Sequence, residues 1–158
     1  MAKQQANEKT AVAKAKAIEQ RWSKPLADAG WTAIPNIVLE KQKALGLTPT
    51  DINVILHIAK HWWEAGAQPY PAVGTIAKAI GVQPRTVQRS ITKMVDLGLL
   101  ERQPRYYAQG GQKSNCYSFQ GLIDQARPFA EELLEQRDAK KRQEQARRRR
   151  DKPLHSVK

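Results

Sequence analysis

The distribution of glycine restricts the fold of this chain more than any other feature of its sequence. All nine glycines lie between Gly30 and Gly121, together with most of the aromatic residues. Because glycine breaks regular secondary structure and aromatic side chains build cores, we expect one compact domain over residues 31–122. A basic helical arm is expected before this domain, over residues 1–30. A second basic helical arm or tail is expected after it, over residues 123–158.

Glycine and proline divide the central part into segments with helical periodicity. A short helix is predicted over residues 34–46, and a second begins at Thr48, a capping threonine followed by proline. Apolar residues lie on two sides of this second helix, as far as Trp63, which indicates a central position in the fold. Two further helices are predicted over residues 73–80 and 84–97, each closed by a glycine. This helix–glycine–turn–helix spacing is typical of a helix-turn-helix motif.

The period of the pattern changes from about 3.6 to 2 after these helices. Residues 99–107 and 114–119 are rich in β-forming residues, and Gln109-Gly-Gly-Gln112 between them is typical of a hairpin turn. Tyr106 and Tyr107 should point in opposite directions, one to the core and one to solvent. Three helices and a small β-hairpin predict a mainly α fold, a winged helix-turn-helix domain with helical arms at both ends.

The helix over residues 84–97 presents two unlike faces. One arc of its helical wheel is apolar around Val87, and the opposite arc is polar and basic. Arginine can donate two hydrogen bonds to guanine, glutamine can pair with adenine, and threonine can touch a thymine methyl group. A merely solvated surface helix is the alternative, but its place between a turn and a basic hairpin favours recognition of DNA. The candidate contacts on this arc are Arg85, Gln88, Arg89, Thr92 and Lys93.

The hairpin over residues 99–119 is also basic. Arg102, Arg105 and Lys113 are candidate contacts with the DNA backbone or minor groove. The two glycines at its tip have no bulk, so the tip can approach phosphates closely, and such contacts position a protein without reading sequence. Protection of an edge strand against aggregation by charge is the alternative.

Composition limits the partners and the compartment. The net charge of +12 points to a polyanionic partner, nucleic acid before a membrane surface. A single cysteine excludes a disulfide scaffold and a zinc site built from cysteines. No apolar stretch is long enough for a signal peptide or a membrane span. We therefore expect a cytoplasmic protein that is associated with the nucleoid when it binds DNA.

Residues suited to catalysis or metal binding are sparse. His57 and His61 are four residues apart, a spacing that can bind zinc, but no third ligand is evident and two surface histidines explain the pair better. Carboxylate pairs suited to acid–base chemistry and a phosphate-binding glycine loop are not apparent. We expect a protein that is not an enzyme, with no metal, no cofactor and no small-molecule effector.

A set of short motifs supports this interpretation. The motifs are Tyr70-Pro71, Ile76-Ala77, Gly81-Val82, Arg85-Thr86-Val87-Gln88-Arg89, Leu97-Gly98-Leu99-Leu100 and Ser114-Asn115-Cys116-Tyr117. Over about residues 24–135 the chain resembles a bacterial winged helix-turn-helix family of small DNA-binding regulators from mobile elements, related to DNA-binding domains of plasmid and phage replication proteins. The resemblance implies a DNA contact at Thr86 besides those named above. Gln83 departs from the family, which usually has a Ser or Thr cap there, so a phosphate contact by such a cap is in doubt.

These observations predict sequence-specific binding to double-stranded DNA. The most direct role is that of a repressor-like transcriptional regulator, reading the major groove with residues 84–97 and the backbone or minor groove with residues 99–119. A plasmid- or phage-type replication or partition accessory protein is one alternative. A winged helix used for protein contact is another, although such a domain usually has few basic residues on its third helix. Binding to RNA stays open as well.

A homodimer is expected, because one winged helix reads only a few base pairs and two copies on a twofold site raise specificity. Pro128 suits the first position of a C-terminal helix. Both arms carry large apolar residues on otherwise polar segments, and these would join two copies unless they pack on their own domain. The residues are Val12, Ile18, Trp22, Phe129, Leu133 and Leu134.

Overall fold

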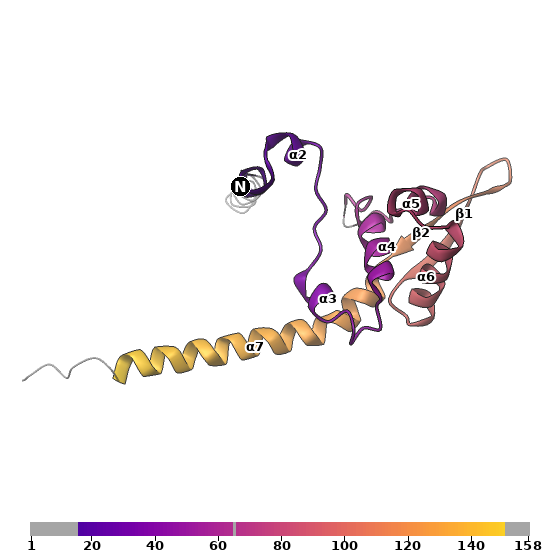
Figure 1. The fold of residues 1–158 in the computed structure, drawn as a ribbon. Helices are drawn as coiled ribbons and strands as arrows, with labels where there is room; N and C mark the ends of the chain where they lie inside the picture. The colour runs from indigo at the N-terminus through magenta and orange to yellow at the C-terminus, as the bar shows by residue number, and fades with distance from the viewer. Residues whose placement is uncertain (1–15, 65, 151–158) are drawn as a thin grey trace, which may run out of the picture. The chain divides into compact units, whose positions relative to one another are not determined.

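The structure, a computed structural model, describes residues 16–64 and 66–150 (Figure 1). The chain forms two compact units, one up to Ala33 and the other from Ile34 onward. In the first unit, residues 16–22 are helical and a short helix, α2 (Lys24–Asp28), follows.

Of the apolar residues expected to join two copies, Ile18 and Trp22 lie in the described part of this first unit. Ile18 is half-buried and Trp22 is exposed. Val12, also expected to join two copies, lies outside the described residues.

The second unit contains a group of packed helices followed by a hairpin and a long helix (Figure 1). Its elements are α3 (Asn36–Glu40), α4 (Pro49–Ala59), α5 (Val73–Ile80), α6 (Pro84–Asp96), β1 (Glu101–Tyr106), β2 (Gln112–Ser118) and α7 (Gln120–Arg150). Helices α4, α5 and α6 pack against one another, and β1 pairs with β2 in antiparallel orientation. The mainly α fold with a small hairpin, which the sequence predicted, is confirmed.

The core lies where α4, α5 and α6 meet the base of the hairpin. Its largest fully buried apolar side chains are Val54, Ile58, Ile76, Val87, Ile91, Met94, Leu99 and Tyr117. Three of these residues, Val87, Ile91 and Met94, belong to the apolar arc predicted for α6. Because this arc is buried, the opposite arc of α6 must face solvent, and the core thereby orients the candidate recognition face.

Helix α4 starts where the sequence predicts. The Thr48 hydroxyl accepts a hydrogen bond from the backbone N–H of Asp51 (3.3 Å), and the Asp51 carboxylate accepts one from the backbone N–H of Thr48 (2.7 Å). This reciprocal capping box satisfies two N–H groups that have no partner within the helix.

Two helices are shorter than predicted. Helix α3 has only five residues, and the chain reaches Gly46 through hydrogen-bonded turns. Helix α4 ends at Ala59, after which the backbone bonds three residues back, from His61 N–H to the Ile58 carbonyl group (3.0 Å). Trp63 therefore lies beyond the helix and is 82% exposed, so its expected place on the apolar face is wrong. Apolar spacing does not show where helical hydrogen bonding stops.

The C-terminal helix begins earlier than expected. Helix α7 starts at Gln120, and Pro128, expected near its first position, lies inside it. Proline removes one backbone hydrogen bond from a helix interior. Burial of Leu122 and Ala126 nevertheless keeps the first turns helical, and the Leu122 N–H donates to the Leu99 carbonyl group (2.8 Å). Packing against the core outweighs the local effect of proline here.

The two ends of α7 have different environments. Phe129 is half-buried against the core, and the Lys41 Nζ lies 5.7 Å from its ring centre. One of the apolar residues considered for a dimer contact therefore packs on its own domain. Leu134 is exposed, as is every side chain described between it and residue 148. The contact between two copies stays a prediction.

Candidate nucleic-acid interface

Helix α6 begins and ends at strong local signals. Pro84 occupies its first position, where the fixed φ suits a helix and the missing N–H costs no hydrogen bond. Gln83 makes no side-chain cap, and its backbone carbonyl group accepts the Thr86 N–H instead (2.9 Å). The helix ends at Asp96, and Gly98 turns the chain with a φ of 68°. These signals define which residues the helix presents.

All five contacts predicted from the wheel lie along one surface. A shallow, open groove of about 520 Å³ runs along α6. It is lined by Arg85, Gln88, Arg89, Thr92, Lys93, Asp96 and Leu97. Thr86 is exposed nearby but does not line the groove. Within the described chain, neither Arg85 nor Arg89 forms a salt bridge, so two guanidinium groups are available to an anionic partner.

Lys93 differs from the rest of this face because it has an internal partner. Its Nζ lies 2.6 Å from Oδ2 of Asp51, and its side chain is 39% exposed. Ser90, one turn earlier, donates to Oδ1 of the same carboxylate (2.6 Å). From the sequence, Lys93 is predicted to contact DNA. Its pairing with Asp51 could not be predicted, because nothing in the local pattern relates two residues that are 42 positions apart.

Two opposing effects act on the pKa of the Asp51 carboxyl group. Burial alone would raise this pKa, since the side chain is only 2% exposed. Hydrogen bonds from Lys93, Ser90 and Thr48 stabilise the carboxylate and together hold the pKa below its usual value. Asp51 is therefore ionised at neutral pH, and its charge balances that of Lys93.

We expect these bonds to make the folded protein sensitive to acid. Because the folded-state pKa lies below the unfolded one, the stabilisation is present above the unfolded pKa and is lost as the pH falls through the folded-state pKa. Chemical unfolding should be measured at neutral pH and at about pH 3. The wild type should lose more stability between the two than Asp51→Asn, which has no carboxylate to titrate. Equal losses would mean that Asp51 contributes no acid-sensitive stability.

The wing, formed by β1 and β2, concentrates positive charge at one place. Its register sets Arg105 directly opposite Lys113, next to an irregularity after Gln103. Arg105 lies 3.9 Å from the ring centre of Tyr70, and Lys113 lies 4.5 Å from that of Tyr107. Like charges directly opposite each other on a hairpin repel, and the attraction of each cation to a tyrosine ring offsets this repulsion.

Arg102, Tyr106 and Tyr107 are exposed to solvent. Arg102 is exposed and pairs in register with the buried Tyr117 near the base of the wing. Tyr106 and Tyr107 are both exposed, at 64% and 56%, so the expected alternation between core and solvent is wrong at this point. The reason is that the hairpin has left the core at this point, so neither tyrosine side chain is buried.

The segment before α5 is tied to the wing. The Tyr117 N–H donates to the Pro69 carbonyl group (2.9 Å), and the Ser114 hydroxyl donates to the Tyr70 carbonyl group (2.9 Å). These bonds hold the Tyr70 ring where Arg105 lies over it. The sequence contains no local signal for this contact, because Tyr70 precedes both helices of the helix-turn-helix motif.

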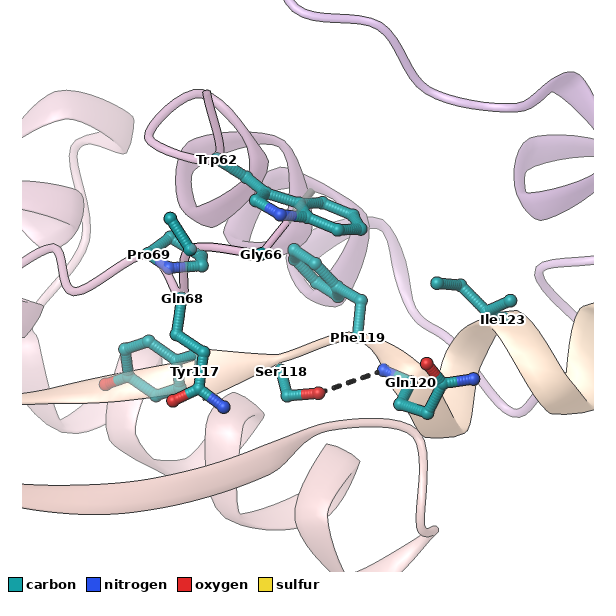
Figure 2. Close-up of a pocket in the computed structure, with 10 residues that line it drawn as sticks. Trp62, Gly66, Gln68, Pro69, Tyr117, Ser118, Phe119, Gln120 and Ile123 are labelled. Atoms are coloured by element: carbon teal, nitrogen blue, oxygen red, sulfur yellow. Dashed lines mark hydrogen bonds between the residues drawn. The ribbon is translucent and has the colours of Figure 1, made fainter. Parts of the chain in front are cut away.

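A small pocket lies beside the base of the wing (Figure 2). Its volume is about 180 Å³, and Trp62 and Phe119 form an aromatic wall with ring centres 5.7 Å apart. The Ser118 hydroxyl at its edge accepts the Gln120 N–H (3.2 Å). None of the described residues that line it is charged.

Nowhere in residues 16–64 and 66–150 do three or more His, Cys, Asp or Glu side chains form a group that could hold a metal ion. Burial, helped by the charges of Lys60 and His61, lowers the pKa of His57. No helix in the same ranges is long and apolar enough to cross a membrane.

Comparison with known proteins addresses the central segment and the fold. Residues 45–100 match the family model of a helix-turn-helix domain. No curated protein matches the chain. The N-terminal domain of the DnaD protein from Geobacillus kaustophilus HTA426 is similar in structure, with a TM-score of 0.50 and 17% identity over 70% of this chain and 88% of that one. At this identity, the likeness shows a shared fold.

Two other solved structures have lower TM-scores. A "possible transcriptional regulator" from Methanosarcina mazei Go1 has a TM-score of 0.43 and 20% identity, over 69% of this chain and 85% of its own. The YusO protein from Bacillus subtilis has a TM-score of 0.38 and 16% identity, over 92% and 99% of the two chains.

Proposed function

We propose, from the match of residues 45–100 to the family model of a helix-turn-helix domain, that the protein recognises specific sequences in double-stranded DNA as a transcriptional regulator. The family match and the hairpin after it agree with the winged helix-turn-helix domain predicted from the sequence. DNA binding is the activity that a helix-turn-helix domain supports.

The free cations on α6 are the observation that carries the proposal. The arc around Val87 is buried, so α6 can offer a partner only its other face, where Arg85 and Arg89 have no acidic partner within the described chain. An α-helix fits the major groove, and arginine there can donate two hydrogen bonds to guanine. Gln88 and Thr92 lie on the same face and suit adenine and thymine. In the proposed complex, the exposed face of α6 enters the major groove.

The wing and the first turn of α6 contact the DNA backbone in this proposal. Arg102, Arg105 and Lys113 supply cations, and Thr86 supplies a hydroxyl group at the helix start. Contacts of this type set the register of the protein on DNA without reading sequence. A winged helix that binds protein usually has few basic residues on its third helix, and the arginines of α6 therefore favour DNA as the partner.

The distal part of α7 adds cations that do not belong to the domain core. Residues 137–148 carry six basic and two acidic side chains, a net charge of +4, and all of them are exposed. We infer that this segment increases affinity for DNA of any sequence through phosphate contacts. We also propose that two copies of the protein bind one twofold-symmetric DNA site, because a single winged helix reads too few base pairs.

The wing is expected to act on all sequences alike. Lys113→Ala should weaken binding to preferred and unrelated duplexes by the same factor. It should also make the slope of log affinity against log salt concentration shallower by about 0.9, because one phosphate contact is lost. Fluorescence anisotropy at several salt concentrations measures both, with exposed Lys43→Ala as a control expected to change neither. A changed base preference at an unchanged slope would contradict the phosphate role.

Selection of duplexes from a random pool tests the proposed function as a whole. We expect enrichment of one sequence, arranged as an inverted repeat with half-site centres about one helical turn, or a multiple of it, apart. Sedimentation of the complex then gives the number of copies per site, and competition with duplex RNA tests the choice of nucleic acid. Enrichment of no sequence, or a preference for RNA, would reject the proposal. Bound genomic fragments at origin repeats rather than promoters would reject the regulatory role alone.

A further inference from the structure

Asp51 attaches α4 to two successive turns of α6. Its carboxylate accepts four hydrogen bonds: from Ser90 Oγ to Oδ1 (2.6 Å), and from Lys93 Nζ (2.6 Å), Thr48 N (2.7 Å) and Thr48 Oγ1 (2.8 Å) to Oδ2. Ser90 and Lys93 are three residues apart, so they are neighbours on the surface of α6. An attachment at two points resists both rotation of α6 about its axis and sliding along it. Apolar packing alone is less directional.

The same attachment balances the charge of Lys93. Its ammonium group lies 2.6 Å from a carboxylate that is nearly inaccessible to solvent, whereas Arg85 and Arg89 have no acidic partner among the described residues. The face of α6 thus carries three cations, of which one is paired internally. A hydrogen-bonded ion pair at this distance, with one partner buried, is held far more firmly than an exposed pair.

We propose that Asp51 is a positioning residue that favours specific over non-specific DNA binding in two ways. It holds α6 in the orientation that brings Arg85 and Arg89 to base edges, and it withholds the charge of Lys93 from phosphates. Phosphate contacts strengthen binding to every sequence, whereas base contacts strengthen binding to one. Withholding one cation therefore lowers non-specific affinity at little cost to recognition. This inference rests on the proposed DNA binding and assigns Lys93 a partner within the protein instead of on DNA.

The variant Asp51→Asn tests the withheld charge. An asparagine amide can still accept hydrogen bonds from Ser90 or Thr48, but it no longer neutralises Lys93. Binding to an unrelated duplex should become tighter, roughly five- to tenfold at about 0.1 M salt, and the salt slope should steepen by about 0.9. The ratio of specific to non-specific affinity should fall. The double variant Asp51→Asn with Lys93→Met should return the salt slope to the wild-type value.

Two further variants test the orientation of α6 and the charge of Lys93 separately. They also test the proposal if circular dichroism shows that Asp51→Asn does not fold. Ser90→Ala keeps both charges but removes one attachment point, so it should lower the specific-to-non-specific ratio without changing the salt slope. Lys93→Met should leave the slope unchanged, whereas the loss of a direct phosphate contact would reduce it by about 0.9.

The inference is overturned if folded Asp51→Asn has the wild-type salt slope, if the double variant stays as steep as Asp51→Asn, or if Lys93→Met reduces the slope. It is overturned in its orienting part if Ser90→Ala leaves the specific-to-non-specific ratio unchanged. Failure of the proposed function is a different result, because the wild type itself would then bind no preferred duplex.

Discussion

Alanine at Arg85 or at Arg89 is expected to weaken binding to the preferred duplex by about 1–3 kcal/mol, or roughly 5- to 150-fold, without unfolding the protein. Both side chains are exposed on the groove of α6, and neither forms a salt bridge within the described chain. Loss of two hydrogen bonds to a guanine removes discrimination at that base pair. Affinity for unrelated duplexes should therefore change much less than affinity for the preferred one.

A competition assay measures this difference between the specific and the non-specific duplex. Arg127→Ala is the matched control, because Arg127 is an exposed arginine on α7 that pairs with Asp124 (3.3 Å). It should bind with nearly the wild-type preference. If Arg85→Ala and Arg89→Ala keep both the wild-type fold and the wild-type sequence preference, α6 is not the recognition helix.

Alanine at Gly121 is expected to lower the free energy of unfolding by about 3 kcal/mol or more, at or beyond the upper end of the usual cost of overpacking. A Cβ at this position would overlap the carbonyl oxygen of Gly98 and lie 3.0 Å from its carbonyl carbon. These are backbone atoms, so no change of rotamer relieves the overlap. The first turn of α7 would have to move away from the turn after α6, straining the bond from the Leu122 N–H to the Leu99 carbonyl group. Thermal unfolding should show a melting temperature lower by roughly 10 °C.

Gly74→Ala is the control for this substitution. Gly74 lies in α5, and a Cβ there meets no atom within 4 Å. Alanine is a better helix former than glycine, so the variant should be unchanged or more stable by up to about 1 kcal/mol. Wild-type melting of Gly121→Ala would show that α7 does not pack closely against the turn at Gly98.

The elements predicted most accurately are those whose signals act over a few residues. Helix α5 has the predicted bounds, α6 begins at Pro84, and the capping box at Thr48 starts α4. A proline at a first helical position, a glycine after a last turn and a reciprocal cap depend only on neighbouring residues. The polar arc of α6 was also predicted from local information, because helical spacing determines which side chains lie opposite a buried face.

Predictions went wrong where the outcome depended on what packs against a segment. Pro128 is a plausible helix start by local rules, yet α7 begins at Gln120 because Leu122 and Ala126 are buried against the core. One of Tyr106 and Tyr107 was expected in the core, but both are exposed because the hairpin has left the core at that point. Where an amphipathic helix begins, and whether the side chains of a strand are buried, both depend on the surface that packs against the segment. Local periodicity does not reveal that surface.

The sequence by itself determined which side chains lie on the polar face of α6, because helical spacing and turn residues are local properties. Only the tertiary structure decided which of them have partners within the protein. It paired Lys93 with Asp51 across 42 positions and left Arg85 and Arg89 without an acidic partner in the described chain. It also set Arg105 over the ring of Tyr70. The physical reason is that charge pairing and cation–π contacts depend on distances in space, which the packing of α4, α6 and the wing establishes and the order of residues does not.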